Sequence, residues 1–172
     1  VETVEANIGW TVPTAIAVDR LGRPHVIYRS SNADGLRYAY RSATGWRVET
    51  VPNEQYGQDV SIVVDSRNRP HIAFGTDLQY GWRDMAGSWR FSVVDDGSNY
   101  VPSLVLDGAG RPHIAYSDLS ERKLLYARHD GWDWQIEEVE TFASNSRAEA
   151  ISLALDWAGR PQIAYYDLAP AD

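Results

Sequence analysis

A seven-residue motif occurs four times in this chain of 172 residues and constrains its fold more than any other feature. The copies read DRLGRPH, DSRNRPH, DGAGRPH and DWAGRPQ, and they begin at Asp19, Asp65, Asp107 and Asp156. A period of roughly 40 to 50 residues is the signature of a repeat architecture in which each unit is one supersecondary element. The chain is therefore expected to fold as an array of similar units.

Each unit predicts four short strands. In the first unit these are residues 14–19, 24–28, 36–41 and 46–51, and the later units carry matching segments. The segments are rich in β-branched and aromatic residues and are bounded by Gly, Pro, Asn or Asp, which is typical of strands. No window shows the apolar period of 3.6 residues that indicates a helix.

The motif itself predicts a tight turn between the first and second strands. One slot holds Gly22, Asn68, Gly110 or Gly159, and Asn is the usual substitute for Gly where φ is positive. Proline follows two residues later and opens the second strand, where a missing N–H costs little.

These units predict an all-β fold, a β-propeller of four-stranded antiparallel blades, with about 3.75 blades in this chain. A β-sandwich is the alternative, although it does not require the same turn at every fourth strand. The expected organisation is a single propeller segment over residues 1–172. Its parts are an outermost strand of an incomplete blade at 1–4, blades at 11–51, 57–94 and 100–139, and an incomplete blade at 148–172.

The incomplete blade leaves three ways to complete the ring. The chain is a segment of a propeller of six to eight blades, or it associates with another copy, or it closes as a small ring with an atypical last blade. Residues 162–167 are apolar on one face, and an unpaired edge of this kind attracts a partner strand. Self-association or completion by further blades is therefore expected in each open form.

The motif resembles a bacterial propeller repeat, D-x-x-G-x-P-H-I-x-Y, found in tandem in large and often secreted proteins. It is similar to the sialidase-like, Asp-box propeller superfamily and to bacterial propeller lectins. The resemblance covers nearly the whole chain, although the Ser and Trp of the Asp-box consensus are absent from all four units. It implies a propeller fold and a secreted or cell-surface location.

Composition excludes several classes of function. The chain has no Cys, so a disulfide framework, a thiolate nucleophile and Cys-ligated zinc are excluded. The net charge of −8 argues against a nucleic-acid partner. No stretch approaches the ~20 apolar residues of a membrane helix, so membrane insertion is not expected.

Three histidines in the motif suggest a metal or acid–base site, but their identical slot favours a structural role. His25, His71 and His113 each open a second strand, and the fourth unit has Gln162, which keeps a hydrogen bond but does not bind metal. The motif Asp is expected to cap backbone N–H groups and to pair with the motif Arg four residues later. No metal site and no cofactor are predicted.

The aromatic residues divide into two groups. Trp46, Trp89 and Trp134 repeat in register and are expected to pack within or between blades. The residues that break the repeat lie in the connections between units, around the predicted central channel. These candidate ligand-binding residues are Trp10, Tyr56 and Tyr100.

Three functions follow from this pattern. The leading one is a non-catalytic module that recognises glycan or protein through the loops around the channel. The second is a structural repeat that assembles with another copy or a parent chain. The third is part of a glycan-active hydrolase or lyase, although no nucleophile elbow, metalloprotease motif, phosphate loop or D-x-D-x-D-G calcium loop is present. No catalytic residue is assigned.

Overall fold

The computed structural model describes residues 2–6, 14–30, 35–53, 59–97, 101–143 and 146–168. These residues form fourteen strands and no helix, as the sequence predicts. In chain order the strands are β1 (Thr14–Val18), β2 (Pro24–Arg29), β3 (Leu36–Ser42), β4 (Gly45–Thr50), β5 (Val60–Val64), β6 (Pro70–Phe74), β7 (Leu78–Arg83), β8 (Trp89–Asp95), β9 (Ser103–Leu106), β10 (Pro112–Asp118), β11 (Lys123–His129), β12 (Trp134–Thr141), β13 (Ala148–Leu155) and β14 (Pro161–Asp167).

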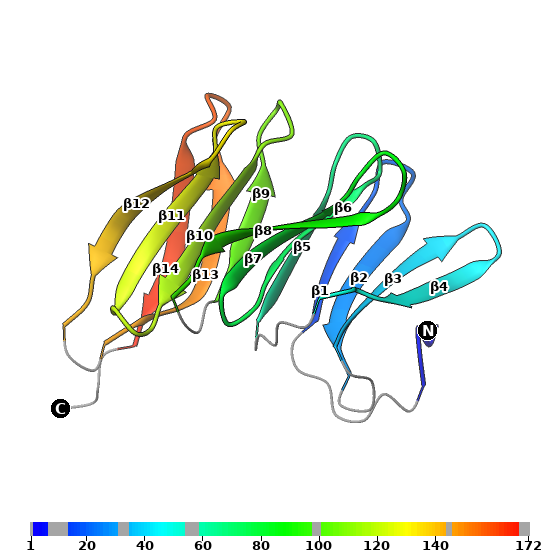
Figure 1. The fold of residues 1–172 in the computed structure, drawn as a ribbon, viewed down its shortest axis with the longest axis horizontal. Coiled ribbons are helices and arrows are strands. Elements are labelled where there is room, and N and C mark those ends of the chain that lie inside the picture. Colours follow the sequence, from blue (N-terminus) through cyan, green and yellow to red (C-terminus); the bar gives the residue numbers. More distant parts are fainter. Residues whose placement is uncertain are drawn as a thin grey trace.

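The strands form four separate antiparallel sheets, which we call blades 1 to 4 (Figure 1). Blades 1, 2 and 3 are four-stranded, and in each of them neighbours in the chain are neighbours in the sheet. Blade 4 consists of the hairpin β13–β14. The predicted four-stranded antiparallel units are therefore confirmed for the first three repeats.

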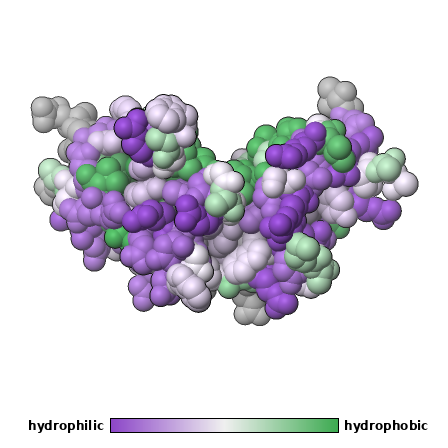
Figure 2. Space-filling view, turned by 90° about the horizontal axis from the view of Figure 1, so that it is seen from above, coloured by the Kyte–Doolittle hydropathy of each residue, from purple (hydrophilic) through white to green (hydrophobic). Residues whose placement is uncertain are grey.

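The first strand of each blade lies on the inside of the assembly. The inner strands β1, β5, β9 and β13 contact one another in that order, and the later strands of each blade extend outward. Seen from above, the described part of the molecule is an open crescent (Figure 2). The blades are thus arranged around one side of an axis.

The turn between the first two strands of each blade forms as its sequence predicts. In blade 1 the Asp19 carboxylate accepts hydrogen bonds from the backbone N–H groups of Leu21 and Arg23, both at 2.8 Å. Gly22 has φ of 74° and Asn68 has φ of 59°, the left-handed conformation that selects Gly or Asn. The second strands of the four blades begin at the motif proline.

The hydrophobic core lies between the blades. At the junction of blades 1 and 2, buried Ile27 and Tyr38 of blade 1 pack against Ile62, Ile72 and Phe74 of blade 2. A second cluster joins blades 2 and 3, and two smaller ones join blades 3 and 4. A blade therefore gains its core only by stacking on its neighbours.

Two kinds of feature are absent from the part of the chain that the structure describes. No helix there is long and apolar enough to cross a membrane. No cluster of three or more His, Cys, Asp or Glu side chains there could hold a metal ion.

Candidate functional site

The motif histidines form part of a structural network, as the sequence analysis predicted. In blade 1 the Nδ1 atom of His25 lies 2.5 Å from the Tyr38 hydroxyl, and its Nε2 atom lies 3.4 Å from the Asp19 carboxylate. Blades 2 and 3 repeat the arrangement around His71 and His113. Burial lowers the pKa of all three histidines, so they are neutral at physiological pH.

The motif arginines pair with the motif aspartates four residues earlier. The Nε atom of Arg23 lies 2.7 Å from Asp19, and the same pairing recurs in blades 2, 3 and 4. Burial acts to raise the pKa of Asp19, but hydrogen bonds from the backbone and side chain of Arg23 outweigh it and lower the pKa to about 2. The same balance lowers the pKa of Asp65 and Asp107.

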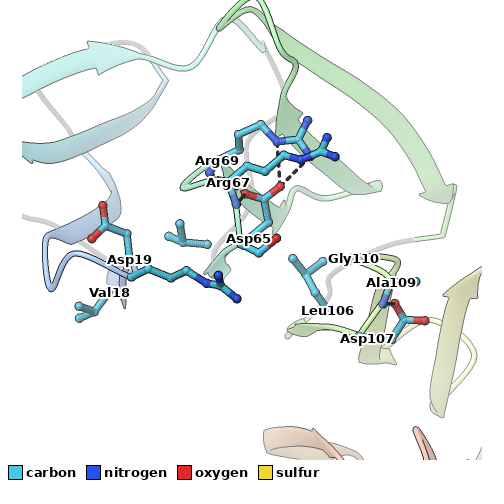
Figure 3. A pocket seen from close by; sticks show the side chains of 13 residues that line it. Val18, Asp19, Asp65, Arg67, Arg69, Leu106, Asp107, Ala109 and Gly110 are labelled. Carbon is cyan, nitrogen blue, oxygen red and sulfur yellow. Dashed lines mark hydrogen bonds and ion pairs between the residues drawn. The ribbon is translucent and has the colours of Figure 1, made fainter.

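A cavity of about 620 Å³ opens where the turn motifs of blades 1, 2 and 3 meet (Figure 3). Its wall contains Asp19, Asp65 and Asp107, together with the guanidinium-bearing Arg20 and Arg67. Figure 3 shows the Asp65 carboxylate paired with the guanidinium of Arg69. Since these aspartates are ionised and already paired, they are poor proton donors near neutral pH.

A second hollow, of about 450 Å³, lies at the junction of blades 1 and 2, and we call it the junction groove. Blade 1 contributes the rings of Tyr38 and Tyr40, and blade 2 contributes Arg83 and Met85. Tyr40 is half-buried and stacks on Tyr38, with ring centroids 5.5 Å apart and planes inclined by 22°. The groove thus presents an aromatic wall beside a cation.

Arg83 is held in place by groups from both blades. Its guanidinium lies 5.4 Å from the ring centre of Tyr38 and 5.9 Å from that of Tyr40, within cation–π range. It also forms an ion pair with Glu49, whose carboxylate accepts a 2.8 Å hydrogen bond from the Trp89 indole N–H. A fixed guanidinium beside an aromatic ring is suited to a ligand with hydroxyl groups and one apolar face.

The junction of blades 2 and 3 uses different side chains in the same slots. Trp82 replaces Tyr40 and stacks on Tyr80 at 5.3 Å, while His129 replaces Arg83 and meets Trp134 edge-on at 5.2 Å. Ser92 replaces Glu49 and accepts the Trp134 indole N–H at 3.2 Å. The arginine–carboxylate pair is therefore a property of the first of these two junctions.

At the end of the inner strands away from the turn motifs lies one carboxyl group with a raised pKa. Asp59 directly precedes β5, and burial, with a smaller contribution from the charge of Glu149, raises its pKa. It is the only carboxyl with a raised pKa among the described residues. The connections between units that carry the candidate ligand-binding residues, which we call the predicted rim, leave the sheets at this same end.

The predicted rim residues Trp10, Tyr56 and Tyr100 lie outside the described residues, so their role stays a prediction. The repeated tryptophans Trp89 and Trp134 pack between blades as expected.

The sequence analysis did not identify Tyr40, Arg83 or Asp59. A signal for Tyr40 was present, since aromatic residues recur two positions after the aligned Tyr of the third strand in units 1 and 2.

Comparison with solved structures finds several similar folds. An α-L-arabinanase from Penicillium chrysogenum, complexed with arabinobiose, is 14% identical with a TM-score of 0.66, and the match covers 91% of this chain and 57% of that one. A fucose lectin from Kordia zhangzhouensis, in complex with methyl-fucoside, is 17% identical with a TM-score of 0.52, covering 76% of this chain and 100% of that one. A xylan β-1,4-xylosidase from Bacillus halodurans is 13% identical with a TM-score of 0.54, covering 96% and 39%.

These likenesses, together with the arrangement of the sheets, settle the architecture. The chain has a β-propeller fold. It spans a little over half the length of the arabinanase and the full length of the lectin. No protein-family model matches the sequence, and no curated protein is significantly similar to it.

Proposed function

We propose that this chain is a non-catalytic propeller module that binds glycan. The junction groove between blades 1 and 2 carries the proposal, because it places the half-buried ring of Tyr40 beside Arg83, whose guanidinium is held by an ion pair with Glu49. The C–H face of a sugar ring stacks on an aromatic ring, while its hydroxyls accept hydrogen bonds from a guanidinium. A protein ligand that presents similar groups is the alternative occupant.

The charges of the groove favour a neutral, hydroxyl-rich ligand over an anion. Of the four arginines that line it, Arg23, Arg69 and Arg83 are each paired with a carboxylate, and the Arg67 guanidinium donates to the Met85 sulfur. The chain as a whole has a net charge of −8, which repels an acidic polymer. Among the similar folds, a lectin is described with methyl-fucoside and an arabinanase with arabinobiose, and both ligands are neutral sugars.

The experiment is a screen of neutral glycans followed by calorimetric titration of the best ligand. Tyr40→Ala is expected to weaken binding at least tenfold, the effect of about 1.4 kcal/mol. Trp132→Ala is the matched control, because Trp132 is 90% exposed in the turn between β11 and β12 and does not line the groove. A Tyr40→Ala protein that binds as tightly as the control contradicts the groove as the site.

The predicted rim is tested separately with a triple variant, Trp10, Tyr56 and Tyr100 to Ala. Loss of binding in the triple variant but not in Tyr40→Ala would move the site to the loop end of the channel. Binding unaffected by either variant would overturn the glycan proposal for both sites. A secreted or cell-surface location fits a glycan-binding role, and fractionation of the producing cells tests it.

The raised pKa of Asp59 favours a second candidate, a glycan hydrolase. Cleavage of a glycosidic bond needs a carboxylic acid that is protonated near neutral pH, and burial shifts Asp59 in that direction. Two of the similar folds are glycoside hydrolases. Hydrolysis of arabinan or xylan by the chain, abolished in Asp59→Asn, would establish this candidate. Turnover unchanged in Asp59→Asn would exclude Asp59 as its acid.

A further inference from the structure

One position of the inner strands is buried in blades 2, 3 and 4 but exposed in blade 1. It lies three residues before the motif aspartate and is occupied by Ile62, Leu104 and Leu153, with exposed fractions of 6%, 3% and 6%. Each of these side chains packs against the preceding blade. In blade 1 this position is Ile16, which is 66% exposed. Blade 1 therefore presents a face that elsewhere in the molecule is covered by another blade.

The face of blade 4 that points away from blade 3 carries the groups that would contact such a following blade. At the inner strands, Ser61 accepts the backbone N–H of Leu104 at 3.1 Å, and Ser103 accepts that of Leu153 at 2.9 Å. Each bond joins a serine, four residues before its motif aspartate, to the backbone of the next blade at the position of Ile62, Leu104 and Leu153. Ser152 is the corresponding serine of blade 4, and it is exposed, as are Ala150 and Ala154 on the same strand. Its equivalent partner in the register of the repeat is the N–H of Ile16.

The N-terminal residues lie where the outermost strand of a preceding blade would lie. Glu2 accepts the Trp46 indole N–H at 3.0 Å, just as Glu49 of blade 1 accepts that of Trp89 in blade 2 at 2.8 Å. Both glutamates stand second in the sequence Val-Glu-Thr-Val. Arg41 also pairs with Glu2, at 3.1 Å.

A second contact fixes the same register. The Tyr28 hydroxyl donates to Glu5 at 2.5 Å, and the Tyr116 hydroxyl of blade 3 donates to Asp95 of blade 2 at 2.8 Å. Each acidic residue directly follows the closing valine of its outer strand. Residues 2–5 therefore contact blade 1 as the outer strand of one blade contacts the next.

We propose that blade 4 of one chain docks on blade 1 of a second copy, so that two copies close one ring head to tail. The Ser152 hydroxyl would accept the N–H of Ile16 in the second copy, and residues 2–5 of that copy would lie outside β14. The two faces belong to the same chain and repeat the junctions already formed within it. A contact between unlike faces generates a closed ring when its rotation closes, and two copies supply eight inner strands, within the range of propellers.

The test is the native mass of the chain, measured by light scattering over a range of concentrations. The proposal predicts twice the 19.3 kDa chain mass at micromolar concentration. Ile16→Glu places a charge in the junction and Ala164→Arg blocks the opposite face, so each variant alone is expected to be monomeric. Both residues are exposed in the single chain, so folding should be unaffected, and circular dichroism checks this. Trp132→Glu is the control and stays dimeric.

Mixing the two variants separates this junction from any other contact. Ile16→Glu retains an intact blade 4, and Ala164→Arg retains an intact blade 1, so the mixture should form a heterodimer with one good junction. A single-chain mass at every concentration overturns the proposal. A dimer that survives both substitutions also overturns it, because its interface then lies elsewhere.

Discussion

The strands β10 and β14 have nearly the same sequence but differ in their surroundings. They read PHIAYSD and PQIAYYD, and each is the second strand of its blade. Every residue of β10 is buried, whereas in β14 only Ile163 is partly buried and the rest are exposed. The repeat motif therefore specifies a strand and its turn, while burial depends on which elements stand beside it.

The difference has a simple physical origin. In blade 3, β10 is paired on both edges, with β9 and β11, and it is covered by blades 2 and 4. In blade 4, β14 pairs with β13 alone among the described strands, and blade 3 covers one face. Most apolar burial in this fold is therefore contributed by neighbours and is lost wherever a neighbour is missing.

Truncating the equivalent tyrosines should give the largest contrast. Tyr116 in β10 is 0% exposed, so Tyr116→Ala should lower the free energy of unfolding by about 3–5 kcal/mol. Tyr165 in β14 is 37% exposed, and Tyr165→Ala should cost about 1 kcal/mol. Urea denaturation in the Ile16→Glu background measures both in the same association state.

Conservative variants separate packing from hydrogen bonding in this pair. Tyr116→Phe keeps the ring and removes the hydroxyl that donates to Asp95, and it should cost about 1 kcal/mol. Equal losses for Tyr116→Ala and Tyr165→Ala would contradict the view that neighbours, rather than the repeat sequence, determine stability.

The sequence predicted the features that depend on one repeat. The strands, the left-handed residue of the turn and the Asp–Arg pair follow from local backbone chemistry, and all are confirmed. The exchange of His for Gln162 also identified the motif histidines as structural. The junction groove was not predicted, because Tyr40 and Arg83 belong to different blades and meet only when the blades stack. The raised pKa of Asp59 depends on burial that no local pattern reports.

The motif histidine should make blade 3 more sensitive to acid than blade 4. Burial lowers the pKa of His113 below its usual 6.5, so the unfolded chain binds more protons than the folded chain as the pH falls through 6.5. The free energy of unfolding should therefore decrease between pH 7 and pH 5. Replacing His25, His71 and His113 by Gln should flatten this decrease, which urea titrations at each pH would measure.

The matched substitution in blade 4 serves as the control for acid sensitivity. At pH 7, His113→Gln should cost about 1–2 kcal/mol, because Tyr126 and Asp107 lose a partner. In the Ile16→Glu background, Gln162→His should leave the pH profile unchanged, because β14 is exposed in the single chain. A triple Gln variant that retains the full decrease would show that other groups cause it. The motif aspartate Asp19 is not one of them, because its pKa of about 2 lies below this pH range.

The smallest effect concerns the serines that join the inner strands, and it distinguishes an occupied junction from a vacant one. Ser103→Ala removes the acceptor of the Leu153 N–H and should lower the free energy of unfolding by about 1 kcal/mol. Ser152→Ala should have no effect on the isolated chain, because Ser152 is exposed there. In the dimer it should weaken association by up to about tenfold, since it then removes the equivalent bond across the junction. Unchanged association in Ser152→Ala would mean that the two copies do not meet in the register of the repeat.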